Sequence, residues 1–557
     1  MASENVESKM AELNVNGTAA TGAGTTAPAT PTDKPKKQDK ERKNQQTSQK
    51  GPKPAKQPQV KKPVVNQDTK QITVSKSEDL AEWYQQVILK AELLEFTDVP
   101  GCYIYLPRSY HIWELIRDFF DLRIKAMGVE NSYFPLFISE ANLQREKDHV
   151  EGFAAEVAWV TEGGKTKLDK KLAVRPTSET AMYSYYAKKI RSHRDLPLKL
   201  NQWNNVEGHT AHLTEAEAGK EVLEILDHYA AIYEDLLAVP VVKGRKTVNE
   251  QFPGAHYTTT IEGFIPAVGR GIQAATSHCL GQHFAKMFEI KIEDPTQKEG
   301  EKKEKIFPWQ NSWGFTTRSI GVMIMIHGDD KGVVIPPRVS NVQVIVVVVG
   351  ITAKTTEEDK ITLLDKGAEI KKTLKSSGLR VELDDREGYS PGFKFAEWEL
   401  KGVPLRLELG PKDLEKSVVA TARRDTGAKD SIPLASLTSD VPKLLDTIQA
   451  DMLKKASDEF AAHRKIVREW KDFVPTLNDK NVILVPHCAG GECEDQIKED
   501  SAGTVPGQEV DVKAPSMGAK SLCIPAEQPE EIKEGQKCIN PKCGKDAAHW
   551  VLFGRSY

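Results

Sequence analysis

The fold of this chain is decided by two short stretches, Arg175-Pro176-Thr177-Ser178-Glu179-Thr180 and Ser312-Trp313-Gly314-Phe315-Thr316-Thr317-Arg318. Each stretch places hydroxyl groups and a carboxylate or a guanidinium among apolar neighbours. Polar groups in such surroundings are costly to bury unless something binds them. We therefore interpret both stretches as parts of one ligand site.

A third stretch, Gly271-Ile272-Gln273-Ala274-Ala275-Thr276-Ser277-His278, brings three polar side chains together among small or apolar residues. Together the three stretches resemble the prolyl-tRNA synthetase family of the eukaryotic and archaeal type, which consists of class II aminoacyl-tRNA synthetases. The resemblance extends from about Glu78 to the terminal Gly554-Arg555-Ser556-Tyr557.

The length of 557 residues exceeds what one hydrophobic core supports and predicts about three domains. The resemblance implies an α/β and α+β multidomain protein. Residues 76–337 are expected to form a class II catalytic domain, an antiparallel sheet with helices. An α/β anticodon-binding domain is expected at 338–440 and a small zinc-bearing domain at 441–557.

Residues 35–76 are rich in Lys, Pro and Gln and almost free of large apolar side chains. We expect residues 1–75 to be a disordered basic tail, with the rest of the chain correspondingly acidic because the net charge is only -3. A Lys-rich tail attracts nucleic acid through counterion release. The alternative is a solvated linker, and the implied tRNA substrate favours tRNA contact.

The sequence shows no apolar run near the roughly 20 residues that span a bilayer, and its first residues do not resemble a signal peptide. We expect a cytoplasmic protein without a membrane partner. Seven cysteines in such a chain favour thiols or a metal site over disulfides.

Apolar periodicity predicts helices at 77–91, with Ser77 as the N-cap, and at 110–127. Strands are predicted at 102–106 and 132–137. The long helix followed by a proline-containing strand resembles the first class-defining motif, which forms the dimer interface in the family. The resemblance therefore implies a homodimer, and synthetase-complex partners are a further expectation.

A run of β-branched residues at 342–349 predicts a strand buried on both faces of a sheet. Alternating helices and strands continue to residue 409, and a long charged helix is predicted at 441–471. The phrase at 401–411 resembles the family's anticodon-binding domain. Candidates for contact with tRNA bases or phosphates are Arg406, Glu408, Arg423 and Arg424. The alternative for each is a surface salt bridge.

In the resemblance, Thr177 and Glu179 bind the cyclic imino group of L-proline. The chemistry agrees, because a carboxylate and a hydroxyl can accept both hydrogens of a secondary ammonium group. The alternative is a helix N-terminus, since Thr177-Ser178-Glu179 also suits a first turn with its acidic residue near the positive end of the helix dipole.

The resemblance assigns the remaining site residues to two groups. His278, Ser312 and Trp313 match the proline pocket, while Gln273, Thr276 and Arg318 match positions that contact ATP. A lone histidine beside apolar residues is more often part of the core, and Gln273 and Thr276 could serve only as strand residues. Arg318 follows two threonines and opens an uncharged stretch, Ser319 to Ile326, that resembles the third class motif.

The implied reaction has two steps. The carboxylate of proline attacks the α-phosphate of ATP to give prolyl-adenylate and pyrophosphate, and the terminal ribose hydroxyl of tRNA(Pro) then attacks the acyl carbon. Positioning and charge stabilisation dominate such catalysis. Mg²⁺ is expected to bridge the phosphates, and no residue is assigned as a catalytic acid or base.

One block of the family is missing. Asn201-Gln202-Trp203-Asn204-Asn205-Val206 runs directly into Glu207-Gly208-His209, where relatives have a strand, a loop and a strand that carry the second class motif. No arginine occurs between Arg194 and Arg245, so the arginines that contact the α-phosphate side are absent. We expect the sheet to open here and the activity of this chain to be impaired. The alternative function is an inactive tRNA- or partner-binding protein on the same fold.

Two Cys-x4-Cys pairs, Cys488 with Cys493 and Cys538 with Cys543, are close to the spacing of structural zinc sites. Four thiolates suit tetrahedral Zn²⁺, and the resemblance to the family's zinc-bearing terminal domain supports it. Scattered free cysteines are the alternative. Cys523 is expected in the core. The resemblance implies that the terminal Gly554-Arg555-Ser556-Tyr557 reaches back toward the active site.

Overall fold

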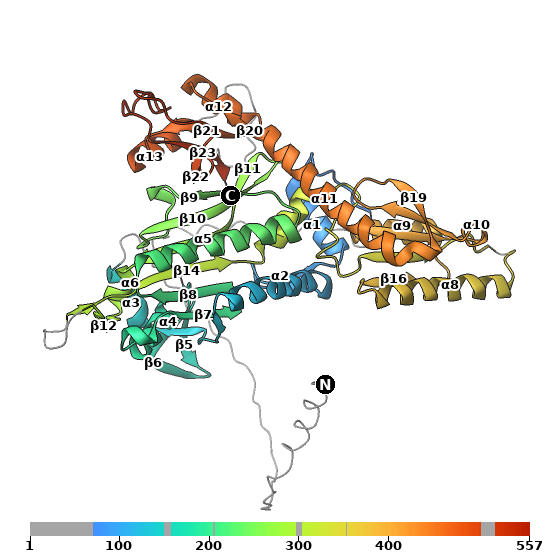
Figure 1. Cartoon of the computed structure of the whole chain (residues 1–557), viewed down its shortest axis with the longest axis horizontal. Coiled ribbons are helices and arrows are strands. Elements are labelled where there is room, and N and C mark those ends of the chain that lie inside the picture. Colours follow the sequence, from blue (N-terminus) through green and yellow to red (C-terminus); the bar gives the residue numbers. More distant parts are fainter. Residues whose placement is uncertain are drawn as a thin grey trace, which may run out of the picture. The chain divides into compact units, whose positions relative to one another are not determined.

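The computed structural model describes residues 71–149, 157–203, 206–296, 304–352, 354–502 and 518–556. Its largest element is an 11-stranded sheet (Figure 1). In spatial order the strands are β20 (Arg464–Ile466), β21 (Val482–His487), β23 (His549–Ser556), β22 (Lys520–Pro525), β9 (Val242–Arg245), β10 (Tyr257–Ile265), β11 (Arg270–Gly281), β14 (Trp309–Phe315), β8 (Val206–His212), β7 (Leu198–Trp203) and β3 (Glu130–Asn131).

Helices α2 (Pro107–Ala126) and α5 (Glu215–Ala231) cover one face of this sheet (Figure 1). A capping box starts α5, in which the Thr214 hydroxyl accepts from the Glu217 amide and the Glu217 carboxylate accepts from the Thr214 amide. Phe120 of α2 stacks on Tyr229 of α5 at 5.1 Å and meets Trp313 of β14 edge-on at 5.8 Å. This face therefore carries the main core of the domain, while α4 (Glu179–Lys189) and α6 (His283–Met287) pack a second apolar cluster on part of the opposite face.

The expectation that the sheet opens at the missing block is wrong, because the short strands β7 and β8 pair with each other. They pair in register from Leu198 with Ala211 to Trp203 with Val206, and they are joined through residues 204 and 205, which lie outside the described part. Two residues suffice for a hairpin turn. The sheet therefore continues from β14 through β8 and β7 to β3, with a shortened hairpin.

Near the start of the described chain, α1 spans Leu80–Lys90 and its N-cap is Asp79 rather than Ser77, because the Asp79 carboxylate accepts from two amides of the first turn. Residues 71–75 are placed against this helix, since the Thr73 amide donates to Gln86 Oε1. The expected disorder is therefore wrong for 71–75, and residues 1–70 lie outside the described part.

Smaller elements surround the catalytic sheet. The prediction of one strand at 132–137 is wrong. Residues 132–136 form no strand and lie between β3 and β4 (Phe137–Ser139). The others are β1 (Leu94–Phe96) with β2 (Tyr103–Tyr105), β5 (Trp159–Gly163) and β6 (Thr166–Val174) beside β4, β12 (Ile292–Glu293) with β13 (Lys305–Ile306), α3 (Glu140–His149), α4 (Glu179–Lys189), α6 (His283–Met287) and α7 (Arg318–His327).

The predicted α/β region is a five-stranded mixed sheet in the order β16 (Val381–Asp384), β15 (Val344–Val348), β17 (Leu405–Leu409), β18 (Val418–Arg423) and β19 (Lys429–Pro433). All five side chains of β15 are buried, as its β-branched run predicts. The sheet is accompanied by α8 (Glu357–Ser376), α9 (Pro391–Leu400) and α10 (Pro411–Glu415).

The long helix α11 (Leu437–His463) ends eight residues before the predicted end at 471, because the chain enters β20 at Arg464. Two helices, α12 (Trp470–Asn478) and α13 (Gly491–Ser501), complete the C-terminal region. Cys523 is fully buried on β22, as expected. The last described strand, β23, also pairs with the start of β11 through Arg555 and Ser556, so the terminus lies beside the strand that carries the site.

Candidate active site and metal centre

The face of the large sheet opposite α2 and α5 brings the second and third sequence stretches together. His278 of β11 lies directly opposite Ser312 of β14, and Thr276 lies opposite Gly314. Cross-strand partners of this kind have Cβ atoms about 5 Å apart and share one face. A histidine ring and two hydroxyls therefore meet at the middle of the sheet, with Gly314 beside them.

A β-bulge decides the position of Gln273. Residues three apart in a regular strand point to opposite faces, so Gln273 and Thr276 should be separated. The register between β10 and β11 shifts between Ile261 and Glu262, which leaves Ala274 as the extra residue. Gln273 is thereby placed on the same face as Thr276 and His278, with its side chain exposed.

The first stretch reaches this face at the start of α4. The predicted helix N-terminus is confirmed, with Glu179 in its first turn, but the side-chain cap hydrogen bond is not formed. Ser178 occupies the N-cap position but makes no cap hydrogen bond. Its hydroxyl donates instead to Glu207 Oε2 of β8. The Ser178 hydroxyl thus attaches the start of α4 to the sheet. In an ordinary N-cap, this hydroxyl would accept a hydrogen bond from an amide of the helix's own first turn.

Glu179, in the first turn of α4, is buried. Burial raises the pKa of its carboxyl, and the hydroxyls of Thr177 and Ser312 offset part of that shift. Neither Thr177 Oγ1 nor Glu179 Oε2 has a hydrogen-bond partner of good geometry among the described residues. Buried acceptors without partners are costly, so this pair is suited to a ligand that donates hydrogen bonds.

Two histidines of the site are held neutral. Burial lowers the pKa of His278 to about 3, with a further contribution from His209, and burial lowers the pKa of His209 to about 4. His278 Nδ1 lies 2.9 Å from Thr258 Oγ1, and the His209 ring lies 3.1 Å from the Tyr183 hydroxyl. Neutral rings leave the charge of Glu179 free for a cationic ligand.

Glu207 is a site residue that the sequence reasoning missed. Burial raises the pKa of its carboxyl, and the nearby charge of Glu179 raises it further, while Arg175 opposes the shift. Arg175 also donates to the carbonyls of Phe134 and Pro135 at 2.8 and 2.9 Å. The alternation of β8 could have indicated Glu207, because it shares the face of His209, which lies opposite Ser312.

Trp313 does not join the other predicted site residues. As the neighbour of Ser312 in a strand it points to the opposite face, where it is buried in the core beside Phe120. A Cβ atom at Gly208 would lie 2.0 Å from its ring, so glycine is required there. The prediction that Trp313 lines the proline pocket is therefore corrected. Its ring packs in the core, on the opposite face of the sheet from Ser312.

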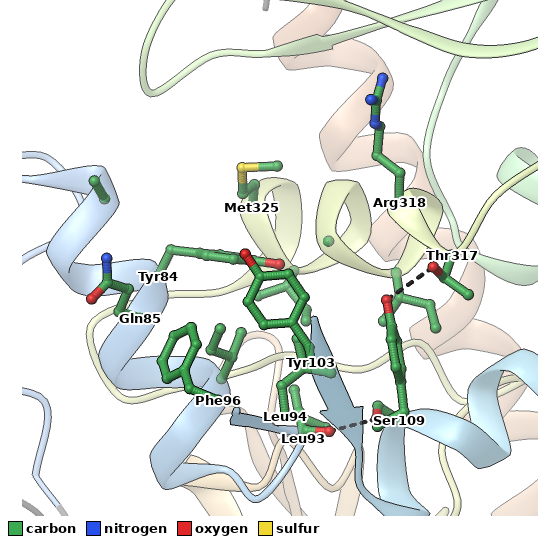
Figure 2. Close-up of a pocket in the computed structure, with 16 residues that line it drawn as sticks. Tyr84, Gln85, Leu93, Leu94, Phe96, Tyr103, Ser109, Thr317, Arg318 and Met325 are labelled. Carbon is green, nitrogen blue, oxygen red and sulfur yellow. Dashed lines mark hydrogen bonds between the residues drawn. The ribbon is translucent and has the colours of Figure 1, made fainter. Parts of the chain in front are cut away.

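Arg318 begins α7, and its side chain is exposed. Arg318 is one of the residues that line a cavity of about 390 Å³, and Figure 2 shows its guanidinium directed away from the aromatic side chains of Tyr84 and Tyr103 in the same cavity. The Tyr105 hydroxyl donates to Thr317 Oγ1 at 2.9 Å. Burial raises the pKa of Tyr233 in the core, and the charge of Arg318 opposes this shift.

The cysteines predicted to bind zinc converge. Cys488 Sγ and Cys543 Sγ are 3.5 Å apart, and Cys493 Sγ and Cys538 Sγ are 3.6 Å apart. These separations exclude disulfides and are close to the ~3.8 Å edge of a tetrahedron built from zinc–sulfur bonds of about 2.3 Å. The hydrogen bond from Cys493 lowers the pKa of Cys538, while the same contact raises the pKa of Cys493 and burial raises that of Cys488.

For the four predicted anticodon contacts, the structure shows the ion-pair alternative. Arg406 pairs with Glu399 and Glu408 at 3.1 and 2.9 Å. Arg423 pairs with two aspartates, and Arg424 forms a two-pronged pair with Asp329. Contact between tRNA and these residues stays a prediction.

Comparison with known proteins places two parts of the chain in families. Residues 343–444 match the family described as "Anticodon binding domain", and residues 470–557 match "Prolyl-tRNA synthetase, C-terminal". The chain is 54% identical to a putative proline–tRNA ligase of Saccharomyces cerevisiae, covering 87% of this chain and 73% of that protein. It is 48% identical to the cytoplasmic proline–tRNA ligase of Arabidopsis thaliana, over 90% and 93% of the two chains.

A solved structure is also similar. The prolyl-tRNA synthetase of Cryptosporidium parvum, complexed with halofuginone and AMPPNP, matches with a TM-score of 0.81 and 48% identity, covering 88% of this chain and all of that one. The predicted fold class is confirmed by this match. The alignment with the yeast relative is 508 positions long, but it covers only 87% of the 557 residues of this chain. The alignment is longer than the covered part of this chain, so the relative has residues without a counterpart here.

Proposed function

Because this chain belongs to the prolyl-tRNA synthetase family, we propose that it is a proline–tRNA ligase that activates L-proline with ATP and transfers it to tRNA(Pro). The observation that carries the proposal is the buried carboxylate of Glu179 with an unpartnered oxygen, on the face shared by His278 and Ser312. A free carboxylate in that position is costly, and a secondary ammonium ion removes the cost.

The proline site is proposed at the start of α4. Glu179 and Thr177 would accept the two hydrogens of the imino group, while His278 and Ser312 line the pocket. The ring of proline is apolar, so neutral histidines suit it better than charged ones. The hydroxyl of Ser178 and the carboxylate of Glu207 fix the helix start in place and so orient Glu179.

ATP is proposed to lie along β11 toward α7. Gln273 and Thr276 are on the correct face because of the bulge, and the exposed Arg318 supplies a guanidinium at the end of β14, suited to a phosphate or to stacking on adenine. Mg²⁺ would neutralise the phosphates when bound. The described residues hold the carboxylate, amide and hydroxyl groups that position the two substrates against each other.

The short hairpin is proposed to slow the first step. The missing arginines would stabilise charge on the α-phosphate, and losing one such donor costs on the order of 10²–10³ in rate. Arg175 is the cation whose charge acts on Glu207, but its guanidinium already donates to two backbone carbonyls. Arg175 is therefore not free to replace the missing arginines, and we expect the adenylation rate to fall. The sheet itself remains continuous through β8 and β7.

Exchange of pyrophosphate into ATP tests the proposal. We expect exchange that depends on proline and is about 100- to 1,000-fold slower than that of the S. cerevisiae relative under the same conditions. Grafting that relative's residues between Gln202 and Glu207 should restore the rate. Exchange near the relative's rate would contradict the role of the missing block, and tRNA binding without any proline-dependent exchange would select the inactive binding protein instead.

A zinc ion is proposed at Cys488, Cys493, Cys538 and Cys543, where its role is to hold the C-terminal region together. The thiol separations fit a tetrahedral ion, and the region adds β22 and β23 to the catalytic sheet.

Among the described residues no helix has the length and apolar character needed to cross a bilayer. A cytoplasmic location is proposed from the resemblance to cytoplasmic relatives.

A homodimer is proposed as the working form. Apolar side chains around β1, β2 and α2 are exposed, among them Val99, Tyr103, Ile104 and Tyr110, and Tyr133 beyond α2 is 79% exposed. Exposed apolar groups that gather on one side of a domain are typical of an interface. Sedimentation at micromolar concentration should give the mass of two chains, and a concentration-independent monomer would contradict the proposal.

A further inference from the structure

The metal centre has one more potential ligand than a tetrahedral ion needs. The ligand atoms of His487, Cys488, Cys493 and Cys538 all lie within 4.8 Å of one another. Cys543 is the fifth, at 3.5 Å from Cys488. Zinc in structural sites takes four ligands, so either Cys543 or His487 is in excess at any moment.

His487 lies beside the thiols, with its ring packed edge-on against Phe553 at 5.3 Å. Its side chain is fully buried, and Nε2 has no hydrogen-bond partner among the described residues. Nδ1 accepts the Ala489 amide at 3.0 Å, so the ring proton lies on Nε2. To bind a metal, the ring must either release Nδ1 from this amide or move its proton from Nε2 to Nδ1. An unsatisfied buried N–H of this kind is costly, which favours a second use for the ring.

The two competing ligands differ in how firmly they are held. His487 ends β21 and pairs with His549 of β23, so its backbone is fixed in the sheet. Cys543 is partly exposed and lies in a turn, before Gly544 with a φ of 66°. Loops open more readily than sheets. Cys543 is therefore the ligand that is lost first.

We propose that His487 is a reserve ligand, which replaces Cys543 and keeps the ion bound by three thiolates and one imidazole. Moving from separations of up to 4.8 Å to the ~3.5 Å expected between nitrogen and sulfur on one zinc ion requires a shift of roughly 1 Å in the ring. The inference rests on the proposed zinc site, but not on the aminoacylation activity.

Metal content and cobalt spectra of the full chain test this proposal. Zinc in the unaltered chain tests the site itself, and Cys538→Ser is the control that removes a ligand needed in both arrangements. We expect Cys543→Ser to retain one metal ion after dialysis against a chelator, with a Co²⁺ charge-transfer band weaker than that of the unaltered chain because one thiolate is gone. We expect Cys543→Ser combined with His487→Phe to lose the ion, while His487→Phe alone keeps four thiolates.

The proposal is overturned if Cys543→Ser loses the metal as completely as Cys538→Ser, or if the double variant retains it as well as Cys543→Ser. Should Cys543→Ser fail to fold, the rate at which a chelator removes zinc from His487→Phe decides. A reserve ligand recaptures an ion that has begun to leave, so release should be about tenfold or more faster than from the unaltered chain, in line with the effect of other metal-site support residues. Equal rates would overturn the proposal.

Discussion

At the scale of single residues, the site is organised around the cost of burying Glu179. Its carboxyl is buried with one oxygen unpartnered, and the adjacent carboxyl of Glu207 adds repulsion. The neutral histidines at 209 and 278 provide no compensating charge. The free protein therefore carries a destabilised carboxylate that a cationic ligand would stabilise, so affinity is obtained at the expense of stability.

Glu179→Gln should separate affinity from stability. Removing one partner of a buried charge pair costs about 2–5 kcal/mol, so proline should bind roughly 30-fold to several thousandfold more weakly by calorimetry. Glu215→Gln, a change in the exposed first turn of α5, is the control and should leave proline affinity unchanged. Normal proline binding by Glu179→Gln would contradict the assignment.

The same variant has a predicted pH dependence. Because the pKa of Glu179 is raised in the folded state, its contribution to stability is present at low pH and is lost as the pH rises through the folded pKa. Glu179→Gln should therefore melt at the same or a higher temperature than the unaltered chain at pH 7.5. Proline affinity of the unaltered chain should weaken as the pH falls through that raised pKa, and the variant should lack this dependence.

At the scale of elements, a buried ion pair joins the catalytic sheet to the C-terminal strands. Lys246, one residue beyond β9, lies 2.7 Å from Glu262 of β10 and donates to the Leu522 carbonyl of β22 at 2.8 Å. Both side chains are buried, and burial raises the pKa of Glu262 although Lys246 opposes it. The pair thus lies where β9 and β22 meet in the continuous sheet.

Lys246→Met should destabilise the chain by about 3–5 kcal/mol, because it leaves a buried carboxylate without its cation. Adding Glu262→Gln should recover part of that loss, since the uncompensated charge is then gone. Urea unfolding measures both. Lys243→Met breaks the exposed pair with Asp227 and is the control, with an expected change of about 0–1 kcal/mol. Simple additivity of the two buried changes would contradict the coupling.

At the scale of the whole molecule, ion pairs and amide contacts join the catalytic and anticodon-binding regions. Arg424 holds Asp329, which follows α7, and Gln449 of α11 donates to the carbonyls of Asp235 and Leu236. Lys76 donates to the carbonyls of Ile326 and Gly328 at the end of α7. The point where the basic tail enters the described structure is therefore attached to the helix that begins with Arg318.

Removing residues 1–70 should weaken tRNA binding and reduce its dependence on salt. Each phosphate contact that is lost lowers the slope of log K against log salt by about 0.7–0.9. A chain of full length in which the lysines between 34 and 62 are changed to glutamine should behave like the truncation, which separates charge from length. Filter binding at several salt concentrations measures the slope, and an unchanged slope would show that the tail is only a linker.

Local pattern was sufficient to predict much of the fold. The β-branched run became the buried strand β15, and the apolar period of α2 became a helix whose Ile112, Ile116, Phe120 and Ile124 are buried. Errors occurred where a neighbour competes with local preference. Asp79 replaced Ser77 as a cap because its carboxylate reaches two amides, and α11 stopped at His463 because the following residues pair with β21.

Within the site, the sequence identified the residue types better than their directions. Ser312 and Trp313 were placed together, yet adjacent strand residues point to opposite faces. Gln273 joins Thr276 on one face only because of the bulge between β10 and β11. His487 was overlooked because two cysteine pairs already completed a zinc site, although it is the residue before Cys488.

Residue types and their spacing indicate the family, which the relatives confirm, and they predict the ligand groups and the missing block. Only the tertiary structure decided which side chains share a face, that the shortened hairpin still closes, and that Arg406 and Arg424 are engaged in ion pairs. These outcomes depend on strand register and on partners distant along the chain, and a shift of one residue in register reverses every side chain of a strand.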